Sequence, residues 1–486
     1  MMQGWRAAGL ALGLGVLAAA GQAPLGAWYL ALPAYAGIMA LVAWAASPRQ
    51  AAWRGWLAGA GHFGAALSWI VQPFFVEPEV YGWMAPFALA LMGFGLALFW
   101  ALPAWLAARF GRAGLIVPLL TGAEMLRGVI FTGFPWALPG HIWIDTPVAQ
   151  LAAYGGANGL TLLVLVLAAL PVLLGWRGVA GAAALLAAVW GFGLWRLAQP
   201  DPAAPGLTLR LVQPNAAQSL KWDPDQAERL LQLQLDYTAA LPRPDLVIWP
   251  ETALPYLLEE GSRVVDAVAA AGQGVPVALG AQRMEGAAAF NSLVVIGPEA
   301  TVTHVYDKHH LVPFGEYVPM GELAYRTFGL RAFAARQGYG YAAGPGAAVL
   351  DLGHLGKILP LICYEAVFAR DLRAAPDRAG WILQITNDAW FGTLTGPFQH
   401  AAQARLRAVE MGLPLVRVAN TGVTGVTDAR GRVTAALPFG VAAYLDAALP
   451  GPLPPTPYAR WGEAPLLVLL AGLAALLFRR RGKGLA

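Results

Sequence analysis

The sequence predicts two structural classes in one chain, an α-helical transmembrane bundle and an α/β domain outside the membrane. Hydrophobic residues make up 58% of the 486 residues and charged residues only 12%, a composition too apolar for an ordinary soluble protein. Long apolar segments with few charges fill residues 1–198, as membrane spans require. From about residue 207 onward, short β-rich runs alternate with polar helical patterns, which is typical of layered α/β domains.

Seven apolar segments lie in the N-terminal region, and several approach the ~20 residues that a helix needs to cross the hydrocarbon core. They cover residues 5–20, 24–47, 53–72, 83–108, 114–131, 158–176 and 178–196. A further apolar segment over residues 463–479 runs into a cluster of arginines that is typical of a cytoplasmic anchor. We therefore predict about seven transmembrane helices within residues 1–198, and a C-terminal transmembrane helix over 463–479 with a basic tail.

Basic residues in the connections predict the orientation of the chain. Those that fall on one side are Arg6, Arg49, Arg54, Arg109, Arg112 and Arg177. The positive-inside rule makes that side cytoplasmic, although Arg127 near an outside loop does not follow it. An odd number of spans then leaves residues 207–449 outside. The first segment also resembles a signal peptide, and its removal would leave the later spans unchanged.

Proline-rich stretches at residues 199–205 and 450–457 bound the α/β region. The candidate strands between them are residues 207–212, 245–249, 275–280, 292–296, 358–363, 381–386 and 415–419. The candidate helices are residues 225–241, 262–271 and 398–411. This alternation predicts an extramembrane domain over residues 207–449, tethered to the membrane at both ends.

Three apolar runs of this domain each end on a residue that can take part in acyl chemistry. These residues are Glu251, Lys308 and Cys363, the only cysteine in the chain. A carboxylate can take the proton of a thiol, and an ammonium can lower the pKa of the thiol and stabilise charge on a carbonyl oxygen under attack. Taken singly, a buried core thiol or a simple ion pair would explain each residue. The three together favour a base-assisted thiol nucleophile.

Other functional classes fit the sequence poorly. The formal net charge is +4, but the basic residues are scattered between apolar segments, so we expect no nucleic-acid partner. His304, His309 and His310 are not accompanied by the spacing of a zinc set, and we predict neither a metal nor a cofactor.

Short segments across the domain match a known family. They are Gln213-Pro-Asn, Lys221-Trp-Asp-Pro, Trp249-Pro-Glu-Thr-Ala-Leu-Pro, Asn291-Ser, Tyr306-Asp-Lys-His-His-Leu-Val-Pro-Phe-Gly-Glu-Tyr-Val-Pro, Cys363-Tyr-Glu, Thr386-Asn-Asp-Ala-Trp-Phe-Gly, Gln399-His and Asn420-Thr-Gly. These segments resemble the nitrilase superfamily, and more closely its membrane-bound branch, the apolipoprotein N-acyltransferase family. The expected spans before and after the domain also resemble that branch.

The resemblance implies an αββα sandwich whose catalytic triad is Glu251, Lys308 and Cys363. It also implies a ping-pong reaction in which Cys363 takes an acyl chain from a phospholipid, typically phosphatidylethanolamine, and forms a thioester. The acceptor is then the α-amino group of the diacylglyceryl-cysteine of an apolipoprotein. The implied location is the bacterial inner membrane, with several spans and a periplasmic catalytic domain. Two membrane tethers around that domain favour a monomer.

Four neighbouring residues are expected to support the triad. Glu316 could orient Lys308 and keep it charged, or be a solvated carboxylate in a turn. Glu365 and Tyr364 follow the nucleophile and could shape its pocket, although Tyr364 could equally be a packing aromatic. Asn291 could hydrogen-bond the catalytic groups or cap a strand.

Three tryptophans, Trp222, Trp136 and Trp390, are candidates for substrate binding. The first two match family positions near the lipid entrance, but tryptophans at membrane interfaces are common anchors in any membrane protein. Residues 323–341 mix aromatic residues with arginines and could form a lid on the membrane surface or an ordinary exposed arm.

Two rival functions remain open at this point. A membrane-tethered amidase would share the triad and use water as the acceptor. A transporter or receptor would use the outer domain only to bind a ligand, but the spans offer few polar residues to line a solute pathway.

Overall fold

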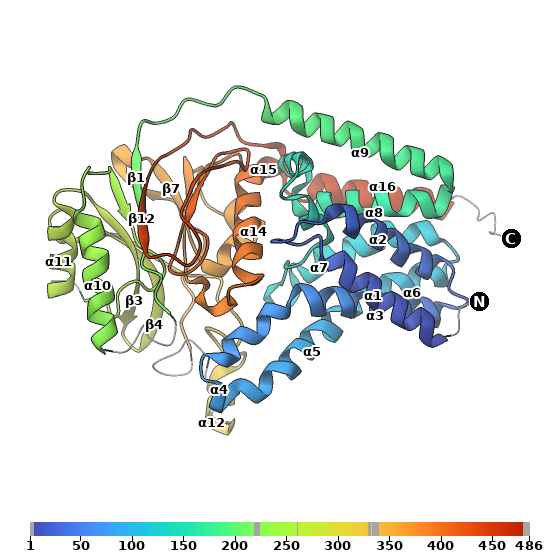
Figure 1. The fold of residues 1–486 in the computed structure, drawn as a ribbon, viewed down its shortest axis with the longest axis horizontal. Coiled ribbons are helices and arrows are strands. Elements are labelled where there is room, and N and C mark those ends of the chain that lie inside the picture. The colour runs from blue at the N-terminus through green and yellow to red at the C-terminus, as the bar shows by residue number, and fades with distance from the viewer. Residues whose placement is uncertain (1–3, 218–223, 260, 329–331, 333–339, 480–486) are drawn as a thin grey trace. The chain divides into compact units, whose positions relative to one another are not determined.

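The computed structural model describes residues 4–217, 224–259, 261–328, 332 and 340–479. Contacts divide the chain into two compact units. The helical unit comprises Met1–Pro200, Leu394–Met411 and Pro455–Ala486, and the α/β unit comprises Asp201–Thr393 and Gly412–Pro454. The predicted fold class, a helical region of apolar helices joined to an α/β domain, is confirmed (Figure 1).

Most helices of the helical unit follow the apolar segments of the sequence. They are α1 (Gly4–Ala19), α2 (Trp28–Ala43), α3 (Pro48–Ala66), α5 (Ala85–Leu96), α6 (Leu98–Arg109), α7 (Ile116–Arg127), α8 (Ala152–Leu174), α9 (Trp176–Leu197) and α16 (Ala464–Arg479). The unit also includes the more polar helices α14 (Gly396–Met411) and α15 (Pro457–Trp461). Among the described residues, three helical stretches are long and apolar enough to cross a membrane, namely Pro78–Arg109, Pro147–Leu174 and Trp176–Leu197. Helices α1, α2 and α16 are apolar but shorter. The number of seven spans stays a prediction.

Small residues allow the first helices to pack closely. A Cβ atom on Gly15 of α1 would lie 2.0 Å from the carbonyl oxygen of Ala58 in α3, and one on Gly61 of α3 would lie 2.2 Å from the oxygen of Leu12. Any larger side chain would push the two backbones apart. Close backbone approach at small residues is the usual way in which helices associate within a membrane.

The α/β unit contains two six-stranded sheets in its described residues. The first has the order β12-β1-β2-β3-β4-β5, and the second has the order β11-β10-β9-β8-β7-β6. The strands of the first sheet are β1 (Thr208–Gln213), β2 (Leu246–Ile248), β3 (Val277–Glu285), β4 (Ala288–Ile296), β5 (Val302–Asp307) and β12 (Ala443–Ala448). Those of the second are β6 (Leu350–Asp351), β7 (Lys357–Ile362), β8 (Trp381–Thr386), β9 (Leu415–Ala419), β10 (Gly425–Thr427) and β11 (Val433–Ala436).

Each sheet has a parallel centre, formed by β1, β2 and β3 in one and by β7, β8 and β9 in the other. Most residues of both centres are buried and apolar, as expected of parallel strands covered on two faces. The apolar core between the sheets includes Leu211 and Ile248 from the first and Ile362 and Ile385 from the second. Because parallel strands end at the same edge, residues that follow β2, β7 and β8 can meet at one site.

Helices α10 (Pro224–Ala239) and α11 (Arg263–Gly272) cover the other face of the first sheet (Figure 1). Their apolar faces supply Leu231, Val265 and Val268 to a second core beneath that sheet. Helix α14, which the sequence places between β8 and β9, is counted in the helical unit by its contacts.

All seven predicted strands are present within a few residues of their expected ends, as are the three predicted helices. The expected strands did not include β6, β10, β11 and β12. The apolar run that ends at Lys308 was expected to be a buried strand; it forms β5, but β5 is half-exposed. Strands β6, β11 and β12 are half-exposed, so their residues lack the continuous apolar run by which the buried strands were found.

Candidate active site

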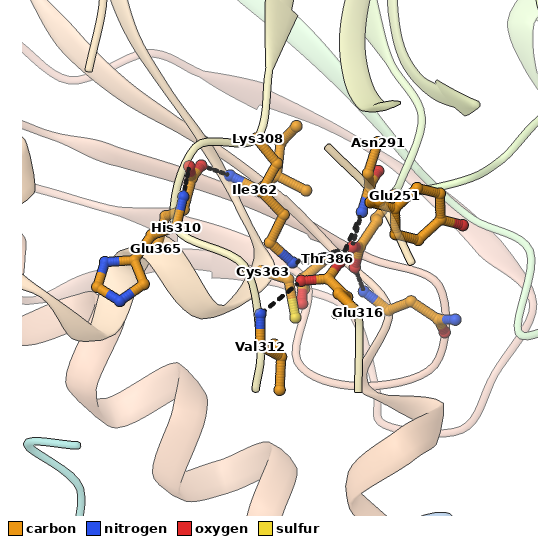
Figure 2. Close-up of polar contacts among 12 residues, drawn as sticks. Glu251, Asn291, Lys308, His310, Val312, Glu316, Ile362, Cys363, Glu365 and Thr386 are labelled. Carbon is orange, nitrogen blue, oxygen red and sulfur yellow. Dashed lines mark hydrogen bonds and ion pairs between the residues drawn. The ribbon is translucent and has the colours of Figure 1, made fainter. Parts of the chain in front are cut away.

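The structure brings the three predicted catalytic residues together (Figure 2). Glu251 follows β2, Lys308 follows β5, and Cys363 follows β7, so both sheets contribute to the site. All three are buried. Lys308 Nζ lies 3.6 Å from Glu251 Oε1, and both charges act on the Cys363 thiol.

Cys363 occupies a strained turn at the end of β7. Its φ is 51°, in the left-handed region that residues with a Cβ rarely adopt, and it opens the 3₁₀ turn Cys363–Val367. Gln384 donates a hydrogen bond of 3.0 Å to the Cys363 carbonyl oxygen. A side chain held on a sharp turn after a strand is presented at the edge of the sheet, as in other nucleophile turns.

Lys308 is paired chiefly with Glu316. Its Nζ donates a hydrogen bond of 2.8 Å to Glu316 Oε1, which is shorter than the 3.6 Å to Glu251. Burial alone would lower the pKa of Lys308, but the charges of Glu316 and Glu251 outweigh it and raise the pKa above its ordinary value. The two carboxylates therefore favour the ammonium form of Lys308, and Glu316 has the contact that the sequence predicted for it.

Asn291 links the two carboxylates. Its Nδ2 donates to Glu251 Oε1 at 2.7 Å and to Glu316 Oε1 at 3.1 Å. Its backbone carbonyl accepts a hydrogen bond of 2.9 Å from the amide of Lys308. Of the two roles considered for Asn291, hydrogen bonding to the catalytic groups is the one that these contacts describe.

Glu251 is fixed from two sides. The backbone amide of Asn387 donates a hydrogen bond of 2.7 Å to Glu251 Oε2, opposite the Asn291 contact. Gly280 of β3 lies directly under this turn, where a Cβ would be 2.6 Å from the Glu251 Cα and 2.5 Å from the Thr252 amide. Only glycine lets the turn that carries Glu251 lie against β3.

Glu365 ties the nucleophile turn to the segment that carries Lys308. Its Oε2 accepts a hydrogen bond of 2.7 Å from the amide of Ile362, and its Oε1 accepts one of 2.8 Å from the amide of His309. Tyr306 also donates to Oε1, at 3.0 Å. Through these contacts Glu365 bridges the turn at Cys363 and the segment that carries Lys308. Its expected support of the triad stays a prediction.

Tyr364 is buried among rings. It stands edge-on to His310 at 5.7 Å and to Phe368 at 4.8 Å between ring centroids. His310 in turn is 2.6 Å from Asp371. These contacts are those of a packing aromatic.

Burial favours the protonated form of the Cys363 thiol. Burial and the charge of Glu251 raise the pKa of Cys363 well above its ordinary value, while Lys308 lowers it. The expected influence of Lys308 therefore has the right sign, but burial and the nearby carboxylate outweigh it.

The three tryptophans fall in different settings. Trp222 lies outside the described residues. Trp390 is half-buried in the turn Asp388–Phe391 after β8. Trp136 is buried in the helical unit, where its Nε1 donates to Gln399 Oε1 at 2.7 Å and its ring lies 4.6 Å from that of Trp69. Their contact with a substrate stays a prediction.

The expected lid is described only in part. Helix α12 (Gly321–Phe328) carries exposed Leu323 and Tyr325, and Phe314 and Met320 just before it are also exposed. Residues 329–331 and 333–339 lie outside the described residues. Exposed apolar side chains at this position fit a membrane-facing arm.

Within the ranges that the structure describes, no group of three or more His, Cys, Asp or Glu side chains is placed to hold a metal ion. His309 and His310 instead pair with carboxylates: His309 Nδ1 lies 2.7 Å from Glu365.

Sequence reasoning missed three residues around the triad. Asn387 supplies the amide that holds Glu251, Asn420 donates a hydrogen bond of 2.9 Å to the Asn387 side chain, and Thr386 contacts Cys363. All three lie in segments that carried the family resemblance, but no role was assigned to them. Only the fold shows that these three residues, among the others of those segments, lie beside the triad.

Two family models match the chain. Residues 14–170 match the apolipoprotein N-acyltransferase N-terminal domain, and residues 208–451 match carbon-nitrogen hydrolase. Fold and site together define the class, an enzyme with a carbon-nitrogen hydrolase domain attached to apolar membrane helices.

Curated relatives extend the match over nearly the whole chain. An apolipoprotein N-acyltransferase of Caulobacter vibrioides is 37% identical and aligns with 96% of this chain and 93% of its own. That of Rhodopseudomonas palustris is 36% identical over 99% and 96%. The chain therefore belongs to the apolipoprotein N-acyltransferase family. A CN-hydrolase superfamily protein from Xanthomonas campestris of known structure aligns with 58% of this chain and 99% of its own, at 19% identity and a TM-score of 0.38.

Proposed function

We propose that this membrane enzyme moves an acyl chain from a phospholipid, through a thioester on Cys363, to the α-amino group of a diacylated apolipoprotein. Phosphatidylethanolamine is the proposed donor. The relatives support N-acyl transfer in lipoprotein maturation. One observation carries the detailed mechanism, namely the buried cluster in which Lys308, Glu251 and the only cysteine of the chain meet.

In the first half-reaction, Glu251 takes the proton of the Cys363 thiol as the sulfur attacks the ester carbonyl of the phospholipid. Negative charge develops on the carbonyl oxygen, and the Lys308 ammonium stabilises it. Glu251 then returns the proton to the departing alkoxide, and a lysophospholipid leaves. Because Glu316 is the closer partner of Lys308, Glu251 is the carboxylate less committed to that ion pair and is the proposed base.

In the second half-reaction, the α-amino group of the lipoprotein attacks the thioester. Glu251 accepts a proton from the attacking amine, the C–S bond breaks, and the electron pair returns to sulfur. Glu251 then passes this proton to the thiolate, which restores the thiol and the free carboxylate. The burial of all three catalytic side chains supports transfer over hydrolysis, since a thioester shielded from water persists until an amine arrives.

The apolar helices support a membrane location, in which the proposed acyl donor and acceptor are both lipids of the same bilayer. The positive-inside pattern supports a multi-pass protein of the bacterial inner membrane with the catalytic domain on the periplasmic side. We propose a monomer, in which the exposed apolar arm at α12 and the candidate residues Trp136, Trp222 and Trp390 contribute to lipid binding.

The proposal is tested with the full-length protein in detergent or nanodiscs. After incubation with phosphatidylethanolamine, intact-mass spectrometry should show one acyl adduct, released by hydroxylamine, on wild type and none on Cys363→Ala. Addition of a diacylated lipopeptide should discharge the adduct and yield a triacylated product. Release of free fatty acid without triacylated product would favour the amidase alternative. An adduct that persists in Cys363→Ala would overturn the thioester.

A further inference from the structure

Thr386 lies beside the nucleophile at the end of the neighbouring strand. Strands β7 and β8 are parallel with Ile362 opposite Ile385, so the next residues of the two strands, Cys363 and Thr386, are side by side. Thr386 is completely buried, and its hydroxyl is hydrogen-bonded to the Cys363 sulfur. Figure 2 shows both residues in the same cluster as Lys308 and Glu251.

Behind Thr386 stands a buried ion pair. The Thr386 hydroxyl donates a hydrogen bond of 3.1 Å to Asp388 Oδ1. Both oxygens of Asp388 also accept from Nη2 of Arg417, at 3.0 and 2.9 Å. Gly422 allows this arrangement, because a Cβ there would lie 2.2 Å from Asp388 Oδ2. Hydroxyl, carboxylate and guanidinium thus form a chain that ends at the sulfur.

The hydroxyl of Thr386 has one proton, which it can donate either to Asp388 or to the Cys363 sulfur. While Cys363 is a thiol, its S–H can donate to the Thr386 oxygen, and the Thr386 proton points to Asp388. Once Glu251 has taken the thiol proton, sulfur is anionic and becomes the better acceptor. Asp388 remains compensated when the hydroxyl turns away, since both hydrogen bonds from Arg417 stay in place.

We propose that Thr386 is a further catalytic residue, a hydroxyl that turns from Asp388 to Cys363 whenever the sulfur carries negative charge. This inference rests on the proposed function, in which a thiolate forms before acylation and again when the C–S bond of the thioester breaks. Thr386 keeps its own proton throughout, so the proton of the thiol still travels to Glu251.

The electrostatics of the site agree with this role. Burial, Glu251 and Asp388 all raise the pKa of Cys363, whereas Lys308 and the Thr386 hydrogen bond lower it. Lys308 is already engaged by Glu316 at 2.8 Å. A neutral hydroxyl adds stabilisation of the thiolate without adding another buried charge.

The test is the pH dependence of thiol alkylation in the full-length protein without lipid, because only one cysteine can react. A hydrogen bond to a charged group contributes enough to move a pKa by about one unit. Thr386→Val should therefore raise the apparent pKa in the pH profile of the iodoacetamide reaction by about one unit. At pH values below this pKa, alkylation of the variant should be about tenfold slower than that of wild type. Thr386→Ser should follow wild type within about twofold, because it keeps the hydroxyl.

Thr427→Val is the matched control. Thr427 is a buried threonine of the same sheet, on β10, separated from β7 by β8 and β9. Thermal unfolding of each variant checks folding, and Thr386→Ala replaces Thr386→Val should the latter not fold. An unshifted profile in Thr386→Val or Thr386→Ala overturns the inference, as does a shift of equal size in Thr427→Val.

The alkylation test of Thr386 can fail or succeed independently of the acyl-adduct test of the proposed function. Alkylation needs no acyl donor, so the shift should occur even if the enzyme proves to use water as acceptor. Conversely, a wild-type protein that forms the acyl adduct while Thr386→Val alkylates normally would sustain the thioester mechanism and overturn the role of Thr386. If the inference holds, Thr386→Val should also lose about tenfold in both half-reactions, with rescue by Thr386→Ser.

Discussion

A buried ion pair in the helical unit and the cluster around Cys363 in the α/β unit both contain charged side chains, but they balance their charges differently. In the helical unit, Glu124 and Arg127 form a buried ion pair one helical turn apart on α7. Trp100 Nε1 donates to Glu124 at 2.6 Å, and Arg127 also donates to the Trp136 carbonyl oxygen at 2.9 Å. One cation meets one anion, and hydrogen bonds occupy the remaining groups.

In the α/β unit, one cation faces two carboxylates and a thiol. Lys308 is paired with Glu316 and approached by Glu251, so the cluster carries an excess negative charge while Cys363 is protonated. A balanced pair is suited to holding structure, and an unbalanced cluster is suited to moving a proton. Buried charge alone therefore does not identify a catalytic site in this molecule.

Replacement of Lys308 should give the largest effect and test this contrast directly. Lys308→Met removes the group that we propose stabilises the charged intermediate, and acyl transfer should fall by about a thousandfold or more. It also leaves two buried carboxylates together, which should lower the unfolding midpoint. The double variant Lys308→Met/Glu316→Gln should recover the midpoint but not the activity. Recovery of acyl transfer in that double variant would show that Lys308 is only structural.

The same pair of experiments in the helical unit should give the opposite result. Arg127→Met leaves Glu124 unpaired and should destabilise the protein by about 3–5 kcal/mol, measured by tryptophan fluorescence during unfolding. Removing both charges with Glu124→Gln/Arg127→Met should restore most of the midpoint together with acyl transfer. If the double variant regains the fold but stays inactive, the distinction between the two regions fails.

Glu365 provides a third, smaller test, because it holds structure within the catalytic unit. Both of its oxygens accept hydrogen bonds from amides, so in Glu365→Gln the new NH₂ group must face a donor. We expect a loss of about 1–3 kcal/mol in unfolding free energy and slower alkylation of Cys363. Glu285→Gln is the control, since that carboxylate is 71% exposed. Equal midpoints for the two variants would contradict the role given to Glu365.

The meeting of Glu251, Lys308 and Cys363 could be predicted because each follows a strand, and strand ends of a layered α/β domain converge. The contacts that surround these three residues could not be predicted from the sequence. Asn387 acts through its backbone amide, which no residue type reveals, and Thr386 matters because of the β7–β8 register. The raised pKa of Cys363 depends on the depth of burial, which is a property of the folded site.

The fold was predictable to a similar degree. Buried parallel strands and apolar helices carry strong periodic signals, whereas edge strands such as β11 carry weak ones. Helix α14 was predicted as a helix, but its membership of the helical unit was not. Its polar contacts there, such as Gln399 with Trp136, arise from a buried polar face that sequence alone does not orient.

The smallest expected effect is the pH-dependent contribution of His309 to the stability of the fold. Burial opposes protonation of His309, but its hydrogen bond to Glu365 and the charges of Glu365 and Asp371 raise its pKa above the ordinary value. A raised pKa means that the folded state binds the proton more tightly than the unfolded chain does. The stabilisation is therefore complete below the ordinary pKa of about 6.5 and is lost as pH rises through the raised value.

His309→Gln should accordingly lower the unfolding midpoint most at about pH 5.5, and the difference from wild type should shrink toward about pH 9. His354→Gln, at an exposed turn, is the control for the substitution itself. A difference that grows with pH would mean that His309 is held neutral in the fold. In that case only amide and hydroxyl donors would compensate Glu365. The region around Cys363 would then differ even more from the balanced pair of Glu124 and Arg127.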